Sequence, residues 1–230
     1  MLLVGTSGYN YPEWRGTFYP EKLPSAKMLP YYAERFRTVE INYTFYRLPN
    51  EALLSGWSAA TPDDFLFTLK APRRITHDAR LQRCDELVQA FCRTARILGP
   101  KLGVLLFQLA PSFKVDADRL RSFVRLLPEG TRAAFEFRHE SWFTAEVFAA
   151  LRERNLALCI ADSEKMRTPV EVTADYAYFR LRDEGYGQED IERWARTISS
   201  LEGVRQTFVY FKHEEKGLGP EFARRLLAAL

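Results

Sequence analysis

The chain has 230 residues, of which 47% are hydrophobic and 14% aromatic, so it can bury the core of a sizeable single domain. Its 33 basic and 30 acidic side chains leave a formal net charge of only +3, which excludes a strong bulk field for holding nucleic acid or membrane. No apolar run approaches the length that crosses a bilayer, and the apolar start of the chain meets Gly5 too soon for a signal peptide. We therefore expect one domain over residues 1–230, located in the cytoplasm and without a membrane partner.

The three cysteines, Cys84, Cys92 and Cys159, lie in apolar or amphipathic stretches and lack CxxC spacing. This pattern favours buried, reduced thiols over a disulfide or zinc framework.

Short β-rich runs alternate with longer amphipathic stretches along the whole chain. The runs predict eight strands, at residues 2–7, 38–42, 65–70, 103–109, 133–139, 157–162, 176–182 and 206–213. The stretches predict seven helices, at residues 28–36, 51–60, 84–98, 116–127, 145–154, 189–201 and 221–230.

This alternation predicts an α/β fold in which parallel strands are joined by right-handed crossovers. Closure into a single TIM-type (β/α)8 barrel leaves no strand edge exposed. The helix after the sixth strand is missing from the pattern, because residues 163–175 contain Pro169 and a β-rich run at 170–173. An irregular connection, able to reach over the barrel mouth, is expected there.

Strand parity separates polar from apolar residues, since side chains two apart share one face of a strand. The apolar register, exemplified by Phe135 and Phe137, should pack under the helices. The polar register reaches the carboxyl ends of the strands and comprises Glu40, Asn42, Thr68, Lys70, Gln108, Glu136, Arg138, Asp162, Arg180, Arg182 and Lys212. These side chains predict a polar pocket at the barrel mouth, where this fold places its active sites.

Several motifs resemble those of one known family. They are Gly5-Thr6-Ser7-Gly8-Tyr9 with Trp14, Glu40-Ile41-Asn42 with Thr44-Phe45-Tyr46, Lys70-Ala71-Pro72 with His77, Leu98-Gly99-Pro100 with Gln108, Phe135-Glu136-Phe137-Arg138-His139 with Trp142, and Tyr178-Phe179-Arg180-Leu181. Together they resemble domain of unknown function 72, the YecE-like proteins, over nearly the whole chain. The resemblance implies a TIM-type barrel and site positions, but no reaction. Arg182-Asp183 and Lys212-His213 depart from the His-Gly and Asn-Asn pairs frequent in that family.

Basic residues gather at one corner of the predicted mouth. Arg180, Arg182 and Lys212 follow the last two strands, which closure places beside the Gly5–Gly8 loop with Thr6 and Ser7. Guanidinium forks and glycine-loop amides match phosphate oxygens, and this corner is the usual phosphate site of the fold. The alternative is an interior network in which these bases only neutralise Glu40, Glu136 and Asp162.

Three residues are candidates for proton transfer. Glu136 is the first choice for general base, with Arg138 able to hold its carboxylate ionised, and Glu40 is a candidate partner acid. Glycoside hydrolysis by this pair fits poorly. TIM-barrel glycosidases place their two carboxylates on the fourth and seventh strands, which here end in Gln108 and Arg180.

Two further candidates follow the third strand. His77 could act as acid or base, or only as a hydrogen-bonding loop residue. Lys70 could bind an anion or form a Schiff base if its pKa were depressed.

A metal site is a further alternative, with Glu136, His139, Asp162 and His213 as oxygen and imidazole ligands. The spacing supports it only weakly, and the chain has no HxH or HExxH motif. No cofactor is indicated by any other motif.

Aromatic residues crowd the loops after the strands and could stack on bases or sugars or simply pack the loops. The candidates for ligand contact are Tyr9, Trp14, Tyr46 and Trp142.

The sequence thus predicts an enzyme, of hydrolase, lyase or isomerase type, acting on a small phosphorylated or phosphodiester-containing ligand. The alternatives are a non-catalytic nucleic-acid-binding or adaptor protein and a metal-dependent phosphodiesterase.

Overall fold

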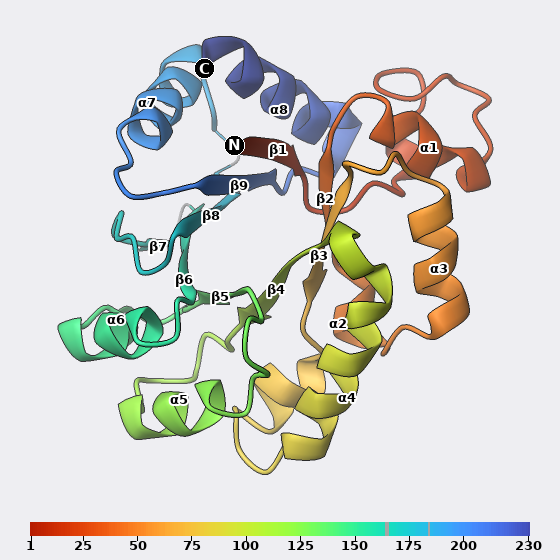
Figure 1. Ribbon diagram of the computed structural model, residues 1–230. Coiled ribbons are helices and arrows are strands. Elements are labelled where there is room, and N and C mark those ends of the chain that lie inside the picture. The colour runs from red at the N-terminus through yellow and green to blue at the C-terminus, as the bar shows by residue number, and fades with distance from the viewer. Residues whose placement is uncertain (164–165, 184) are drawn as a thin grey trace.

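Eight parallel strands form the central sheet of the computed structural model, which describes residues 1–163, 166–183 and 185–230 (Figure 1). They are β1 (Leu2–Thr6), β2 (Thr38–Ile41), β3 (Leu66–Lys70), β4 (Leu102–Gln108), β5 (Ala133–Glu136), β6 (Ala157–Ser163), β8 (Tyr176–Leu181) and β9 (Gln206–Phe211). Their order is β1-β9-β8-β6-β5-β4-β3-β2, so each strand lies beside its neighbour in sequence and β9 returns to β1. The predicted TIM-type barrel is confirmed.

The barrel is nearly closed between β1 and β2, which share only an isolated parallel bridge between Ser7 and Glu40. Gly5 permits this approach, because a Cβ atom there would overlap the carbonyl oxygen of Thr38. The Tyr32 hydroxyl spans the gap: it accepts from the Thr6 amide at 2.8 Å and donates to the Thr38 carbonyl at 3.1 Å. A side chain thus replaces part of the missing strand ladder.

The helices pack around the outside of the barrel (Figure 1). The α-helices of six or more residues are α1 (Met28–Ala33), α3 (Glu51–Ala59), α4 (Asp85–Ala95), α5 (Ala117–Val124), α6 (Ala145–Arg152), α7 (Gln188–Ser199) and α8 (Leu218–Ala229). Side-chain oxygens of Asn50, Asp116 and Thr144 accept backbone N–H groups in the first turns of α3, α5 and α6. A short α2 (Tyr43–Tyr46) and a π-helical turn, η3 (Arg74–Asp78), follow β2 and β3.

The connection between β6 and β8 is irregular, as predicted, although residues 164 and 165 lie outside the described residues. β7 (Met166–Arg167) pairs antiparallel with the end of β6. The chain then returns to the amino end of the barrel, where the Thr173 hydroxyl accepts from the Leu158 amide and donates to the Leu156 carbonyl, both at 2.7 Å. Residues 170–173 are outside any strand, so the β-rich run at that place did not predict a β-element.

Two hydrophobic layers confirm most of the parity prediction. Phe67, Phe107 and Phe135 pack between strands and helices, whereas Leu106 and Tyr210 belong to a separate cluster inside the barrel. The three cysteines are buried free thiols. None of the described helices is long and apolar enough to cross a membrane.

The parity of β6 corrects the position of Asp162. Leu158 and Ile160 face the helices, whereas Cys159 and Ala161 face the interior. Asp162 therefore lies on the outer face and not in the barrel mouth.

Candidate functional site

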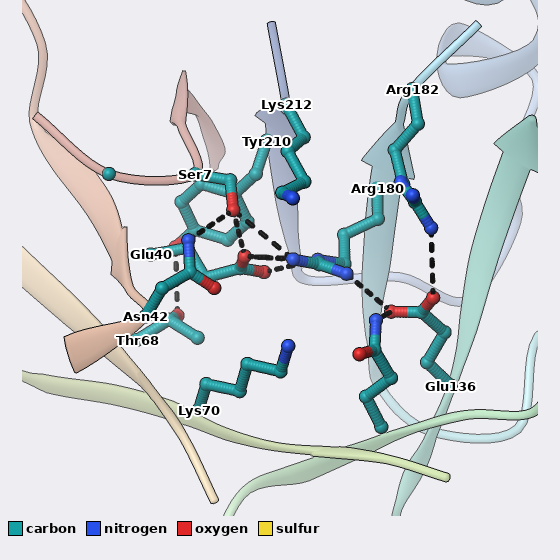
Figure 2. A network of polar contacts seen from close by, with 12 residues as sticks. Ser7, Glu40, Asn42, Thr68, Lys70, Glu136, Arg180, Arg182, Tyr210 and Lys212 are labelled. Carbon is teal, nitrogen blue, oxygen red and sulfur yellow. Dashed lines mark hydrogen bonds and ion pairs between the residues drawn. The ribbon is translucent and has the colours of Figure 1, made fainter. Parts of the chain in front are cut away.

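Arg180 lies at the centre of a buried ion-pair network at the carboxyl end of the barrel (Figure 2). Its Nε donates to both oxygens of Glu40 at 2.9 Å, its Nη2 donates to Glu40 at 2.7 Å, and its Nη1 donates to Glu136 at 2.7 Å. Arg180 is 1% exposed, Glu40 0% and Glu136 1%. Charges buried this deeply are tolerated only when they are paired and hydrogen-bonded, and this arrangement meets both conditions.

Glu40 on β2 has a full set of donors. Besides Arg180, it accepts from the hydroxyls of Ser7 and Tyr178. The Ser7 hydroxyl in turn accepts from Asn42 Nδ2 at 2.9 Å. Burial alone would raise the pKa of Glu40, but the charge and hydrogen bonds of Arg180 together with the two hydroxyls lower it, so this carboxylate stays ionised.

Glu136 at the end of β5 is held in the same way. Gln108 Nε2 donates to it at 2.8 Å, and the guanidinium groups of Arg138 and Arg182 each approach its other oxygen to 3.8 Å. Burial opposes ionisation, yet the charges of the three arginines lower the pKa of Glu136 to about 2. The carboxylate therefore has no proton to donate and is a weak base, so the predicted acid/base role of Glu136 does not fit this geometry.

The ring of cations above this network is only loosely paired. We call Lys70, Arg138, Arg182 and Lys212 the rim. The side chains of Arg138, Arg182 and Lys212 are 30%, 23% and 31% exposed. Their charge partners lie at 3.5 to 3.8 Å, outside hydrogen-bond distance. These cations can therefore turn to a ligand without leaving a buried charge unpaired.

Arg182 and Lys212 line a hollow of about 440 Å³ at the ends of β8 and β9. The segment from the end of β9 to the start of α8 supplies the rest of its described lining, with His213, Glu214, Glu215 and Leu218. This is the corner at which barrels of this type commonly bind phosphate, and its size suits a small molecule.

Lys70 differs from the other rim cations. It is 8% exposed, and its Nζ lies 4.1 Å from the centre of the Phe45 ring. Burial, reinforced by the positive charges of Arg180 and Lys212, lowers the pKa of Lys70 to about 7, although Glu136 and Glu40 oppose this shift. This is the direction of shift that the predicted Schiff-base role of Lys70 requires.

His77 lies near Lys70, with Phe45 in contact with both. Its ring packs edge-on against Phe45 at 5.1 Å, and its Nδ1 is 2.9 Å from the Thr76 hydroxyl. Burial, with help from Lys70 and Arg73, lowers the pKa of His77, so its imidazole is largely neutral at pH 7.

The aromatic candidates have different surroundings. Tyr9 lines an apolar hollow of about 390 Å³ together with Asn42, Tyr43 and Trp57. Tyr46 is 80% exposed.

Trp14 and Trp142 are buried and pack loops. The indole N–H of Trp14 donates to the Glu214 carbonyl at 2.7 Å, and that of Trp142 donates to the Phe113 carbonyl at 2.6 Å. Both indoles are at most 1% exposed, so the expectation that they contact a ligand is not supported.

The Gly5–Gly8 loop does not form the predicted amide cradle. The amides of Thr6, Ser7 and Gly8 donate to Tyr32, Phe211 and Glu40 within the protein, and the Thr6 hydroxyl donates to the Gly8 carbonyl at 2.6 Å. Gly5, Thr6 and Ser7 close the barrel and support Glu40 instead of meeting a phosphate.

Asp162 anchors α7 to the barrel from outside. It accepts from the Arg182 amide at 3.0 Å, from the Tyr186 hydroxyl and from the Trp194 indole at 3.2 Å. The prediction that it lines the pocket is wrong, because Leu158, Ile160 and Asp162 share the helix-facing side of β6.

The proposed metal ligands do not converge. Glu136 faces the interior, Asp162 faces the helices, His139 Nδ1 bonds to Ser141 at 2.9 Å, and His213 Nε2 is 2.7 Å from the Asp183 carbonyl. Across residues 1–163, 166–183 and 185–230, no group of three His, Cys, Asp or Glu side chains is arranged to hold a metal ion.

Two tyrosines of the site were missed in the sequence. Tyr178 donates to Glu40, and the Tyr210 hydroxyl bridges the hydroxyls of Thr38 at 2.6 Å and Thr68 at 2.8 Å. Each lies two residues before a basic residue, Arg180 or Lys212, so the same parity that selected those bases also indicated the tyrosines.

The chain is similar to a family described as of unknown function and to several individual proteins. A family model described as "Protein of unknown function DUF72" matches residues 3–230. UPF0759 protein YecE of Escherichia coli strain K12 is 32% identical over 144 residues, 62% of this chain and 50% of YecE, so the match spans half the length of that relative. UPF0759 protein YunF of Bacillus subtilis strain 168 is 21% identical over 100% of this chain and 95% of YunF.

Solved structures show the same fold. A DUF72 family protein from Thermotoga maritima MSB8 superposes with a TM-score of 0.88 at 29% identity, over 99% of this chain and 98% of that one. A DUF72 family protein from Enterococcus faecalis V583 gives a TM-score of 0.84 at 18% identity, over 100% and 95% of the two chains.

Proposed function

The chain belongs to the DUF72 family, whose description names no reaction. From the geometry of the site we propose that this protein is an enzyme and that its barrel mouth binds a small phosphorylated ligand. The observation that carries the proposal is the position of Arg182 and Lys212 over a hollow of about 440 Å³, with charge partners no closer than 3.5 Å. A phosphate oxygen at hydrogen-bond distance would be a better partner for either cation than its present one.

The charge balance of the site supports an anionic ligand. The buried carboxylates of Glu40 and Glu136 carry two negative charges, and Arg180 neutralises one of them through contacts of 2.7 to 2.9 Å. Arg138 and Arg182, each 3.8 Å from Glu136, neutralise the other and leave one positive charge in excess, whereas the charge of Lys212 is offset by Glu214. The mouth therefore carries excess positive charge in a partly desolvated place, which attracts anions.

The same geometry argues against glycoside hydrolysis by Glu40 and Glu136. That reaction needs one protonated carboxyl group as acid, whereas Arg180 lies between these two groups and lowers the pKa of both.

Calorimetric titration with inorganic phosphate and glycerol 3-phosphate tests the proposal. Arg182→Ala and Lys212→Ala should each weaken binding about tenfold or more, since a charged hydrogen bond contributes roughly 1.5–3 kcal/mol. Arg205→Ala is the matched control, because Arg205 is 86% exposed and pairs with Asp175 next to the amino ends of the strands. Binding that is equal in all four proteins would contradict the proposal.

A further inference from the structure

Lys70 and Lys101 are buried to the same degree but have opposite surroundings. Lys101 is 6% exposed, and its amine donates to the carbonyls of Ser58 at 2.7 Å and Thr61 at 2.8 Å. Lys70 is 8% exposed, and no hydrogen bond or ion pair joins its amine to any residue that the structure describes. The Lys101 amine is thus held as a structural donor, whereas the Lys70 amine points into the polar end of the barrel (Figure 2), against the Phe45 ring and with no hydrogen-bond acceptor among the described residues.

The surroundings of Lys70 favour the neutral amine. Burial removes water from the amine, and the positive charges of Arg180 and Lys212 oppose its protonation more than the contact with the Phe45 ring and the two carboxylates favour it. With a pKa of about 7, roughly half of the amine carries a free lone pair at neutral pH, and such lysines are nucleophiles.

The neighbours of Lys70 also suit the product of an attack by this amine. Glu40 and Glu136 remain ionised and act electrostatically on Lys70, so they would stabilise a cationic iminium group formed there. Arg182 and Lys212 line the hollow at this end of the barrel and would bind an anionic group elsewhere on the same small molecule.

We propose that Lys70 forms an imine with a carbonyl group of the ligand, which makes the substrate class a small phosphorylated aldehyde or ketone. The inference rests on the proposed function, since Arg182 and Lys212 hold the phosphate. The Lys70 nitrogen forms a bond to the carbonyl carbon, and the carbonyl oxygen takes up a proton. The nitrogen lone pair then expels that oxygen as water, and both amine hydrogens leave with it, so that amine and carbonyl become imine and water.

Reductive trapping tests the inference. The protein is incubated with pyridoxal 5′-phosphate or, as the matched probe without phosphate, with pyridoxal, then reduced with sodium borohydride and mapped by peptide mass spectrometry. Lys70 should be labelled at least about tenfold more by pyridoxal 5′-phosphate than by pyridoxal at equal concentration, and inorganic phosphate should compete. Lys101 should stay unlabelled with both probes, because its amine is bound.

Variants separate the possible outcomes. Lys70→Arg keeps the charge, and once its fold is verified by thermal unfolding it should lose the mapped label while exposed lysines keep theirs. If Lys70 stays unlabelled although phosphate binds in calorimetry, the imine is overturned and the proposed function stands. If both probes label Lys70 equally, and the double variant Arg182→Ala, Lys212→Ala is labelled by pyridoxal 5′-phosphate as strongly as the wild type, the phosphorylated substrate class is overturned together with the phosphate site. Label on Lys212 in place of Lys70 also overturns the imine at Lys70.

Discussion

The floor and the rim of the barrel mouth both consist of charged side chains, but these differ in burial and in how closely they are paired. In the floor, Arg180, Glu40 and Glu136 are at most 1% exposed and joined by hydrogen bonds of 2.7 to 2.9 Å. In the rim, Arg138, Arg182 and Lys212 are 23% to 31% exposed, with partners at 3.5 to 3.8 Å. Buried, fully paired charges hold a structure in one arrangement, whereas loosely paired charges at a surface are free to bind. The comparison assigns stability to the floor and ligand binding to the rim.

Loss of Arg180 should give the largest effect on stability. Arg180→Met would leave two buried carboxylates without their common cation, at a cost of roughly 3–5 kcal/mol in the free energy of unfolding. Urea denaturation measures this change. The triple variant Glu40→Gln, Arg180→Met, Glu136→Gln removes the charges together and should recover part of the loss. A loss below about 1 kcal/mol in the single variant would contradict the structural role of the floor.

Acid should weaken the floor through Glu136. The pKa of this carboxyl is lowered to about 2 in the folded protein, so its stabilising contribution is fully present above about pH 4.5 and is lost as the pH falls toward 2. The contribution amounts to roughly 3 kcal/mol. Unfolding free energies at pH 7, 4 and 3 should fall less steeply in Glu136→Gln than in the wild type. Glu146→Gln, at a half-exposed surface pair with Arg121, should keep the wild-type slope.

Tyr210→Phe should have an intermediate effect. It removes the hydroxyl that joins Thr38 of β2 to Thr68 of β3 from inside the barrel, without changing the packing of the ring. The expected loss is about 1 kcal/mol, the usual contribution of a buried hydrogen bond. Thermal unfolding measures it, and an unchanged transition would show that this bridge does not support the barrel.

Most of the fold could be predicted, and part of the site could not. The alternation of strands and helices predicted the barrel, and the alternation of polar and apolar residues within single strands placed Glu40, Glu136 and Arg180 inside it. The same reasoning failed at Asp162, since the register of β6 is set by Leu158 and Ile160 and ends with Asp162 facing Trp194 of α7. A polar residue at a strand end does not by itself reveal which face it occupies.

The division between floor and rim could not be predicted from the sequence either. It depends on distances across the barrel, between residues as far apart in the chain as Glu40 and Arg180. Gly5 likewise matched a phosphate-binding loop, but its small size serves the approach of β1 to Thr38. Both differences arise from packing between strands, which no pattern within one strand records.

The most direct test of this division compares ligand-free and phosphate-bound stability in one experiment. Unfolding free energies are measured with and without saturating inorganic phosphate for the wild type and for the double variant Arg182→Ala, Lys212→Ala. We expect the two proteins to differ by about 1 kcal/mol or less without phosphate, because Arg182 lies 3.8 Å from Glu136 and this carboxylate keeps its closer partner Arg180 at 2.7 Å. With phosphate at about 100 times its Kd, the wild type should gain roughly 2.7 kcal/mol and the double variant almost nothing. An equal gain in both proteins, or a large ligand-free loss in the variant, would contradict the assignment of binding to the rim.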